Sequence, residues 1–331
     1  MATANYQLPT KLTFYPSYPL YAYASGVLRN PDTNIPDISD EDLYSLISLN
    51  PSKIKKLDVE GMDSFIKYQA YKDYKSDFFG VLGHDFYMSS QHIKLFLNNE
   101  MISGTPVVNG CLNFNGDYNG WSLEDVNDFD GTELFIKFNN VSTTNVGSFF
   151  WGSKFQCPQN LDLKMTYNVK YGYKNKTTIG GKTLSTLNYQ KTDKWLLDAW
   201  ELDDQVADTR NSPSTSRNGI REWSVSMSML QDSKMMSQNN MLNNDNWTQD
   251  SGSEYSTGAG GSSDSLYTTD NSVDFYSLVI KMTMGGHLPC VVNISDSKNS
   301  DQWAIVRISD YSITQNNPKL VDIKMTLKEQ V

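Results

Sequence analysis

Residues 161–173 read Leu-Asp-Leu-Lys-Met-Thr-Tyr-Asn-Val-Lys-Tyr-Gly-Tyr, an alternation of apolar and polar side chains. Successive side chains on a β-strand point to opposite faces, so this period of two predicts a strand with one buried and one wet face. The same alternation recurs in residues 223–229, Trp-Ser-Val-Ser-Met-Ser-Met, and in residues 321–327, Val-Asp-Ile-Lys-Met-Thr-Leu. Three amphipathic strands far apart in the sequence predict an antiparallel sheet that folds into a sandwich or a barrel.

The composition also favours a mainly β fold. The mean hydropathy is −0.50 with only 20% charged residues, so solubility comes largely from Asn, Ser, Thr, Gln and Asp. Such side chains suit the turns and long polar loops of β-rich proteins. A chain of 331 residues is long enough for two domains. We divide it into residues 1–140, with an aromatic N-terminal arm, short helices and a mixed β region, and residues 141–331, where the periodicity is clearer.

Three segments have helical features. Residues 39–50 begin with Ser39 as a possible cap, continue with three acidic residues and stop at Pro51. Residues 62–75 place apolar side chains at helical spacing. Residues 273–284 fit either a helix or a strand, and the following Gly285-Gly286 favours a flanking helix, because glycine commonly ends helices. Residues 80–120 predict short strands broken by glycines.

Two polar regions and the N-terminal segment leave alternatives open. Residues 14–23 are aromatic and interrupted by Pro16 and Pro19, which bar a continuous central strand. This segment fits an extended arm on a neighbouring subunit or a surface-packed segment. The loops 203–218 and 233–272 flank the strand around residue 225 and fit either flexible surface loops or loops that order on neighbouring subunits.

Charge and cysteine content bound the partners and the compartment. The net charge is −10 and no dense Lys/Arg cluster stands out, so we expect no specific nucleic-acid partner. No stretch is apolar enough for a membrane span, and the N-terminus lacks the pattern of a signal peptide. The three cysteines, Cys111, Cys157 and Cys290, lack metal-site spacing. We expect buried free thiols and assembly in a reducing bacterial cytoplasm.

A search for catalytic motifs finds none, so we expect no enzyme activity and no cofactor. The phosphate-binding glycine loop, the His-Glu-x-x-His zinc motif and the Gly-x-Ser-x-Gly elbow are all missing. His84 beside Asp85 can form a base with its orienting carboxylate, but adjacent residues on a strand point apart. Cys157 with His287 can form a thiolate pair, although neighbouring prolines favour turns there.

Two clusters keep other functions open. The first is acidic and can hold calcium or supply the carboxylate pair of a glycan hydrolase, although an acidic turn is the simpler interpretation; its members are Asp117, Glu124, Asp125, Asp128, Asp130 and Glu133. The second is the Asn- and Gly-rich stretch 109–122, where Tyr118 and Trp121 can stack on sugar rings or pack in a core. A carbohydrate-binding module on a virion surface is therefore one alternative function, and a tail-associated glycan hydrolase is another.

A series of short motifs runs through the second half of the chain. A glycine pair is followed by tryptophans, an Arg-x-Trp strand, a Gly-Gly-x-Leu-Pro element and an Asp-Gln-Trp-Ala strand. Its key residues are Gly180, Gly181, Trp195, Arg221, Trp223, Gly285, Gly286, Pro289, Asp301 and Trp303. Alone, each glycine pair predicts only a turn, because glycine adopts positive φ without steric cost.

As an ordered series over residues 147–331, these motifs resemble a family of virion structural proteins of tailed bacteriophages. The resemblance implies a relative of the tail-tube and distal-tail fold: a β-barrel with a flanking helix, over residues 141–331, that assembles as an oligomeric ring. It implies a non-enzymatic role in a tail or baseplate, with copies of itself and other tail proteins as partners. It also implies a place in the virion tail. The chain departs from the family pattern at Ile220, where a second Arg is common, and at residues 290–292, which replace Phe-Ile-Phe; residues before 140 match less well.

Overall fold

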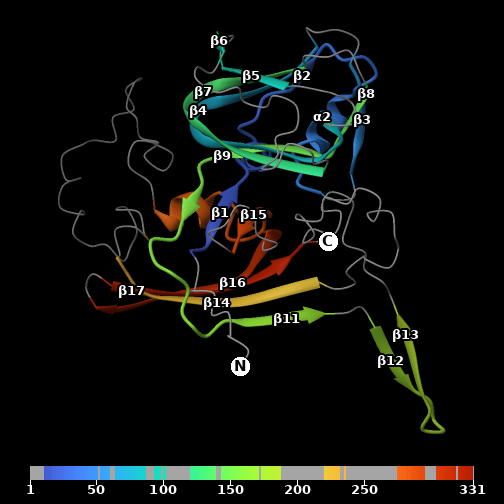
Figure 1. The fold of residues 1–331 in the computed structure, drawn as a ribbon, viewed down its shortest axis with the longest axis vertical. Helices are drawn as coiled ribbons and strands as arrows, with labels where there is room; N and C mark the ends of the chain where they lie inside the picture. Colours follow the sequence, from blue (N-terminus) through green and yellow to red (C-terminus); the bar gives the residue numbers. More distant parts are fainter. Residues whose placement is uncertain are drawn as a thin grey trace, which may run out of the picture.

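The computed structural model describes most of the chain and shows a mainly β protein in which two larger antiparallel sheets lie one above the other (Figure 1). The described residues are 11–50, 53–59, 64–86, 93–97, 100–101, 120–138, 143–170, 173–187, 220–231, 235, 274–294, 303–317 and 320–330. The expectation of an antiparallel, mainly β fold with a flanking helix is confirmed.

The lower sheet contains the three amphipathic segments as neighbours. Within the described residues it has seven strands, in the order β10 (Phe155–Gln156), β1 (Thr13–Pro16), β15 (Cys290–Asn293), β16 (Trp303–Asn317), β17 (Leu320–Glu329), β14 (Ile220–Gln231) and β11 (Thr166–Lys170). All neighbours pair antiparallel. The apolar residues of β17 and the first half of β14 are buried on one face, as their alternation predicts.

The upper sheet is built around two long strands. In the described part it has six strands: β2 (Asp32–Thr33), β4 (Phe65–His84), β7 (Gly120–Phe138), β5 (Ile93–Leu97) and β6 (Glu100–Met101) follow in order, and β9 (Ser148–Gly152) pairs with β4. Two further ladders join β3 (Lys55–Asp58) to β8 (Thr143–Val146) and β12 (Tyr173–Thr177) to β13 (Thr183–Leu187). The helices of the described residues are α1 (Tyr18–Ala24), α2 (Asp40–Ser45) and the π-helix η2 (Tyr276–Lys281).

The N-terminal segment joins the two sheets. Strand β1 lies in the lower sheet between β10 and β15, although it precedes residue 140 by far. Conversely, β9 follows residue 140 and pairs with β4 in the upper sheet. Tyr15 of β1 packs edge-on against Phe78 of the upper sheet, with ring centroids 5.1 Å apart, and against Trp303 of the lower sheet, at 5.4 Å. Of the aromatic residues in 14–23, Tyr23 is exposed and the other four are buried in the chain's own core. Neither an arm on a neighbour nor a surface segment describes these four. The division at residue 140 stays a prediction.

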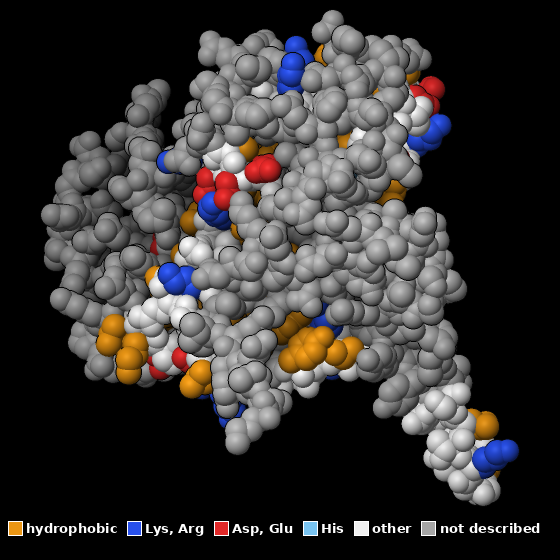
Figure 2. All heavy atoms as spheres, viewed as in Figure 1, with side chains coloured by type: hydrophobic (Ala, Val, Ile, Leu, Met, Phe, Trp, Pro, Cys, Tyr) orange, Lys and Arg blue, Asp and Glu red, His pale blue; other side chains and the backbone are white. Residues whose placement is uncertain are grey.

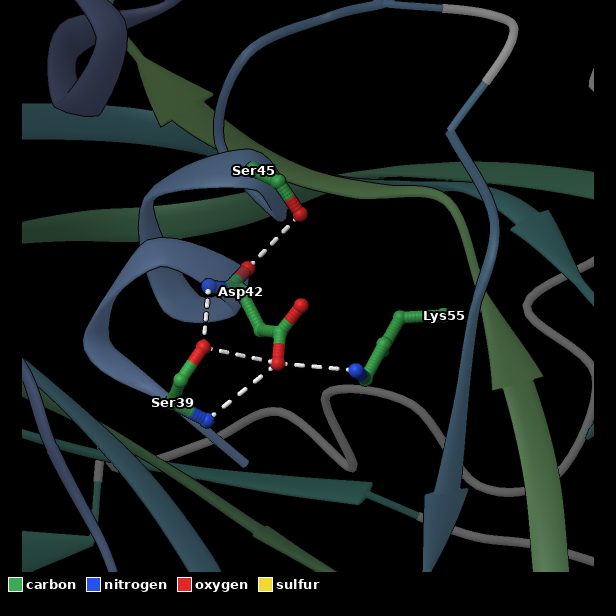
Figure 3. A network of polar contacts seen from close by, with 4 residues as sticks. All are labelled: Ser39, Asp42, Ser45 and Lys55. Carbon is green, nitrogen blue, oxygen red and sulfur yellow. Dashed lines mark hydrogen bonds and ion pairs between the residues drawn. The ribbon is translucent and has the colours of Figure 1, made fainter. Parts of the chain in front are cut away.

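Helix α2 is short and starts where the sequence places it. The Ser39 hydroxyl accepts from the Asp42 amide, and the Asp42 carboxylate accepts from the Ser39 amide, which closes a capping box (Figure 3). Lys55 binds the same carboxylate at 2.8 Å and, with Ser39, lowers the pKa of Asp42. The helix ends at Ser45, well before Pro51, so capping is confirmed and the predicted length is wrong.

The predicted helix over residues 62–75 is wrong. From Phe65 onward the chain forms β4, in which Ile66, Tyr68 and Ala70 are buried at a period of two. The helical prediction rested on a different set, Met62, Phe65, Ile66 and Gln69, so the same segment fits both periods and local periodicity does not separate the two structures. Antiparallel pairing with β7 along nearly the whole strand decides for β.

A β-bulge in β14 corrects a second prediction. The alternation points Met229 inward, but the pairing with β17 shifts register between Met227 and Leu230. Met229 takes positive φ (59°) and is exposed, while Leu230 is fully buried. The extra residue of a bulge moves the inward position by one, so the strand keeps its buried face beyond the bulge.

The helical interpretation of residues 273–284 is confirmed in π form over residues 276–281, and residues 282–284 form a turn. Backbone bonding ends with the Gly285 amide donating to the Ile280 carbonyl at 2.7 Å. Met284, Gly285 and Gly286 all have positive φ. A Cβ on Gly286 would lie 2.0 Å from the Ile308 carbonyl oxygen, so this position requires glycine to bring the chain against β16.

Candidate functional site

A buried ion pair forms the polar centre of the lower sheet. The Arg221 guanidinium on β14 donates from Nη2 to Glu329 Oε1 at 2.8 Å and from Nε to Oε2 at 3.0 Å. The Arg221 backbone amide donates to the same Oε2 at 3.0 Å. The side chains are only 7% and 3% exposed. This bidentate geometry suits a guanidinium and a carboxylate, and it ties β14 to the end of β17.

Two tryptophans of the motif series surround this pair. The Arg221 guanidinium lies over the Trp223 ring at 4.5 Å, a cation–π contact. Its Nη2 also reaches the Trp303 carbonyl on β16 at 3.4 Å. Arg221, Trp223 and Trp303 were singled out from the sequence, and the structure brings them together. Glu329 was not predicted as a site residue, although the period of two that turns the apolar residues of 321–327 inward also places Glu329 on the buried face.

The other motif residues lie apart from this centre. Gly180 and Gly181 lie in the exposed turn between β12 and β13, with Gly181 at a φ of 79°. Gly285 and Gly286 end η2, and Pro289 is buried just before β15. Trp195 and Asp301 lie outside the described residues. The described residues of the motif series therefore lie in three separate places: the ion pair between β14 and β17, the turn of the β12–β13 hairpin and the end of η2.

Strand β11 and the residues just before it leave apolar side chains on the surface at the edge of the lower sheet. Leu163 is 92% exposed, and Met165 and Tyr167 are close to half exposed. Tyr167 contacts Trp223, with ring centroids 5.7 Å apart, so this surface continues from the buried core. Figure 2 shows hydrophobic side chains gathered where β11 lies in Figure 1. In the described part of the chain, β11 pairs on one side only. The prediction of one strand over residues 161–173 is therefore wrong in its bounds, because among its described residues only 166–170 form a strand of this sheet. Leu161 is buried, whereas the later apolar positions 163, 165 and 167 are exposed in the single chain.

The β12–β13 hairpin projects from the body of the protein (Figure 1). Its described side chains, those of residues 175–185, are all exposed, and Ile179 at the turn is fully so. Residues 173–187 include three lysines and no acidic residue, in a chain of net charge −10. A two-stranded hairpin is at best marginally stable by itself in water, so burial against another surface would stabilise this one.

A shallow polar hollow of about 410 Å³ lies on the lower sheet across β11, β14, β17 and β16. Its polar lining follows two cross-strand rows. The first runs Thr166, Ser224, Thr326 and Asp310, and the second runs Ser226, Lys324 and Ser312, with Lys164 beside them. Because serines are small, the surface is low along β14 between the longer side chains of the flanking strands. These residues were not predicted as a site, although the lysines occupy the wet positions of segments 161–173 and 321–327.

The histidine and cysteine candidates, His84, Cys157 and Cys290, are buried within the fold. His84 is buried, and its Nε2 lies 2.8 Å from the Ser122 hydroxyl. Burial lowers the pKa of His84 to about 3, so its ring is neutral at ordinary pH. Asp85 accepts instead from Thr144 and from the amides of Asn145. Cys157 and Cys290 are buried free thiols, as predicted, and burial raises the pKa of both, that of Cys290 to about 12.

The acidic cluster is not gathered around one point in the described residues. Asp125 pairs with Lys154 at 2.8 Å, and Glu133 pairs with Lys67 at 3.2 Å. Within the described part, no three His, Cys, Asp or Glu side chains are grouped closely enough to hold a metal ion. Asp117 and the side chains of Asp128 and Asp130 lie outside the described residues.

Other sequence candidates also lie outside the described part. They are Tyr118, the Trp121 side chain, Cys111 and nearly all of the two long polar loops. Among the described helices, none has the length and apolar character needed to cross a bilayer.

Comparison with known proteins gives partial structural likenesses. No family model matches the chain, and no curated protein matches it. One similar solved structure is CpGH89CBM32-6 of Clostridium perfringens, with 10% identity and a TM-score of 0.28 over 37% of this chain and 92% of that one. Another is CBM32-3 from a family 31 glycoside hydrolase of the same organism, with 13% identity and a TM-score of 0.28 over 39% of this chain and 92% of that one.

A third likeness is to the CBM32-1, CBM32-2 and M60 catalytic domains of Clostridium perfringens ZmpB. It has 8% identity and a TM-score of 0.28, and covers 45% of this chain and 17% of that one. CBM32 domains are carbohydrate-binding modules. At these TM-scores the likenesses carry no argument about the function of this chain.

Proposed function

We propose that this protein is a non-enzymatic structural component of a bacteriophage tail or baseplate, which assembles with copies of itself into a ring. The single observation that carries the proposal is the open edge of the lower sheet, where Tyr167 on β11 and Leu163 and Met165 just before it are exposed. Contiguous apolar surface of this kind marks sites of protein association. The motif resemblance supplies the virion context, with other tail proteins as further partners and the virion tail as the location.

The assembly mechanism follows from the shape of a ring. Ring closure requires a heterologous interface, in which two different patches of each subunit meet. Strand β11 is one patch, since an edge strand can pair with a strand of a neighbour while its apolar side chains become buried. The basic β12–β13 hairpin is adjacent in sequence and supplies a second contact toward the acidic remainder of a neighbouring chain.

The assembly proposal is tested with the purified full-length chain. Its mass in solution is measured by light scattering across a range of concentrations, and closed rings are sought by electron microscopy. Tyr167→Glu places a charge on the β11 surface and is expected to abolish assembly. Ile54→Glu, at a partly exposed position (38%) just before β3, is the matched control and leaves assembly intact. A wild-type chain that stays monomeric at every concentration, or a Tyr167→Glu chain that still forms rings, contradicts the proposal.

The virion context has its own test. Mass spectrometry of purified particles should find the protein, and cryo-electron microscopy should trace it into a closed ring around the tail axis. Absence of the protein from the purified particles would contradict the virion assignment.

A carbohydrate-binding role is the second candidate, and the polar hollow favours it. The hollow offers several hydroxyls, two lysines and one carboxylate on a rigid sheet, and sugars are recognised through many hydrogen bonds of this kind. A glycan array probed with the purified chain tests this role. The absence of binding to every glycan removes the second candidate and leaves the assembly proposal standing.

A further inference from the structure

The hydrogen-bond donors and acceptors that line the hollow on the lower sheet indicate which class of sugar would bind there. Lys164 and Lys324 both line it, and neither has an ion-pair partner in the part of the chain that the structure describes. Some other lysines of the described residues are paired, as Lys55 is with Asp42 and Lys154 with Asp125. Two unpaired ammonium groups beside one hollow form a local positive centre in a chain of net charge −10.

The other polar groups that line the hollow indicate which functional groups a negatively charged ligand would carry besides its charge. The row formed by Thr166, Ser224 and Thr326 presents hydroxyls on three neighbouring strands, each able to donate and to accept. Adjacent strands lie about 4.8 Å apart, so the row spans roughly 10 Å, an extent that suits an extended polar ligand. None of these hydroxyls has a hydrogen-bond partner within the described residues.

Asp310 ends this row and discriminates between classes of anion. An ionised carboxylate only accepts hydrogen bonds, so a ligand over it needs hydroxyl or amine donors. A phosphate or a strongly acidic peptide is repelled there. A sugar with ring hydroxyls and one carboxylate satisfies both ends, with its hydroxyls over Asp310 and its carboxylate near the lysines.

We propose that this hollow is a binding site for an acidic saccharide of the uronic-acid class. The proposal rests on the carbohydrate-binding candidate function and is independent of ring assembly. Lys164 and Lys324 hold the carboxylate, the hydroxyl row binds the sugar ring, and Asp310 accepts from ring hydroxyls. The site lies on regular strands, so it is formed before the ligand binds and loses little conformational entropy on binding.

The test measures binding of trigalacturonate and its neutral methyl ester to the full-length protein by calorimetry. Trigalacturonate is expected to bind at least about tenfold more tightly than the ester, because each charge-assisted hydrogen bond contributes that much or more. The double variant Lys164→Gln/Lys324→Gln should remove this preference. Both side chains are exposed, so the fold is unaffected. The matched control, Lys176→Gln/Lys182→Gln, removes two exposed hairpin lysines and should keep full binding.

Each outcome bears on a different part of the proposal. Equal binding of the acid and the ester, unchanged by loss of the hollow lysines, overturns the acidic class but keeps the sugar-binding candidate. If the hairpin variant Lys176→Gln/Lys182→Gln loses as much binding as the hollow variant Lys164→Gln/Lys324→Gln, the effect of charge is nonspecific and the proposed site is overturned. Tighter binding of a hexaglutamate peptide than of trigalacturonate overturns it in favour of a protein partner. Failure of the chain to bind any glycan on an array overturns both the proposal and the candidate function.

Discussion

Replacing Glu329 by leucine tests whether the buried ion pair holds the lower sheet together. The carboxylate accepts from Arg221 Nη2 at 2.8 Å, from Nε at 3.0 Å and from the Arg221 amide at 3.0 Å. Leucine removes all three acceptors but leaves the guanidinium buried against Trp223. An arginine does not lose its charge at any ordinary pH, so the variant retains an uncompensated buried cation.

The expected cost is a large part of the stability of the protein. Removing one partner of a buried ion pair destabilises a protein by about 3–5 kcal/mol. Domains are stable by only about 5–15 kcal/mol in total. The double variant Arg221→Leu/Glu329→Leu removes both charges and should recover most of the loss, because well-packed apolar residues replace buried ion pairs at little net cost.

The assay is urea denaturation of the full-length chain, followed by tryptophan fluorescence. Glu222→Gln on the same strand is the control, since Glu222 pairs with the exposed Lys170 at the surface and should cost less than about 1 kcal/mol. The reasoning is refuted if Glu329→Leu costs no more than Glu222→Gln. It also fails if the double variant is less stable than either single variant.

Three further predictions concern buried positions. Gly286→Ala is expected to destabilise the protein by at least about 1–3 kcal/mol, because φ is +93° and the new Cβ overlaps the β16 backbone. A loss of 1 kcal/mol lowers the melting temperature by about 2–4 °C, so a melting temperature within about 1–2 °C of wild type would contradict this prediction. In a Cys111→Ser background, Cys157 and Cys290 should resist a thiol reagent until denaturant is added, because burial raises both pKa values; rapid labelling of the native chain argues against their burial. Because the pKa of His84 is lower in the folded protein than in the unfolded chain, the unfolded chain binds a proton at a higher pH than the folded protein does. The free energy of unfolding therefore decreases as pH falls from about 6.5, the pKa of an unperturbed histidine, toward about 3, by at most about 1.4 kcal/mol per pH unit. His84→Gln should flatten this part of the stability profile, and a profile of unchanged slope tells against the neutral buried ring.

The candidate site shows how far sequence reasoning extends. Arg221, Trp223 and Trp303 were identified from an ordered motif series, and the structure places them in one cluster. Their partner Glu329 is 108 residues from Arg221 in the sequence. The alternation places Glu329 on the buried face of β17, but nothing local identifies Arg221 as its partner. The polar hollow was missed for the same reason, since its rows exist only when four strands lie side by side. The ring and virion assignments stay predictions.

The sequence by itself determined features that depend on near neighbours along the chain. The alternation over 321–327 sets the buried face of β17, Ser39 caps α2, and Gly285-Gly286 ends η2. These follow from the geometry of a strand and from the conformations that individual residues adopt. Only the tertiary structure decided that residues 65–75 form a strand, that a bulge exposes Met229, and that Tyr15 lies between two sheets. Each of these depends on pairing or packing with distant segments, and a local pattern carries no information about which distant partner supplies it.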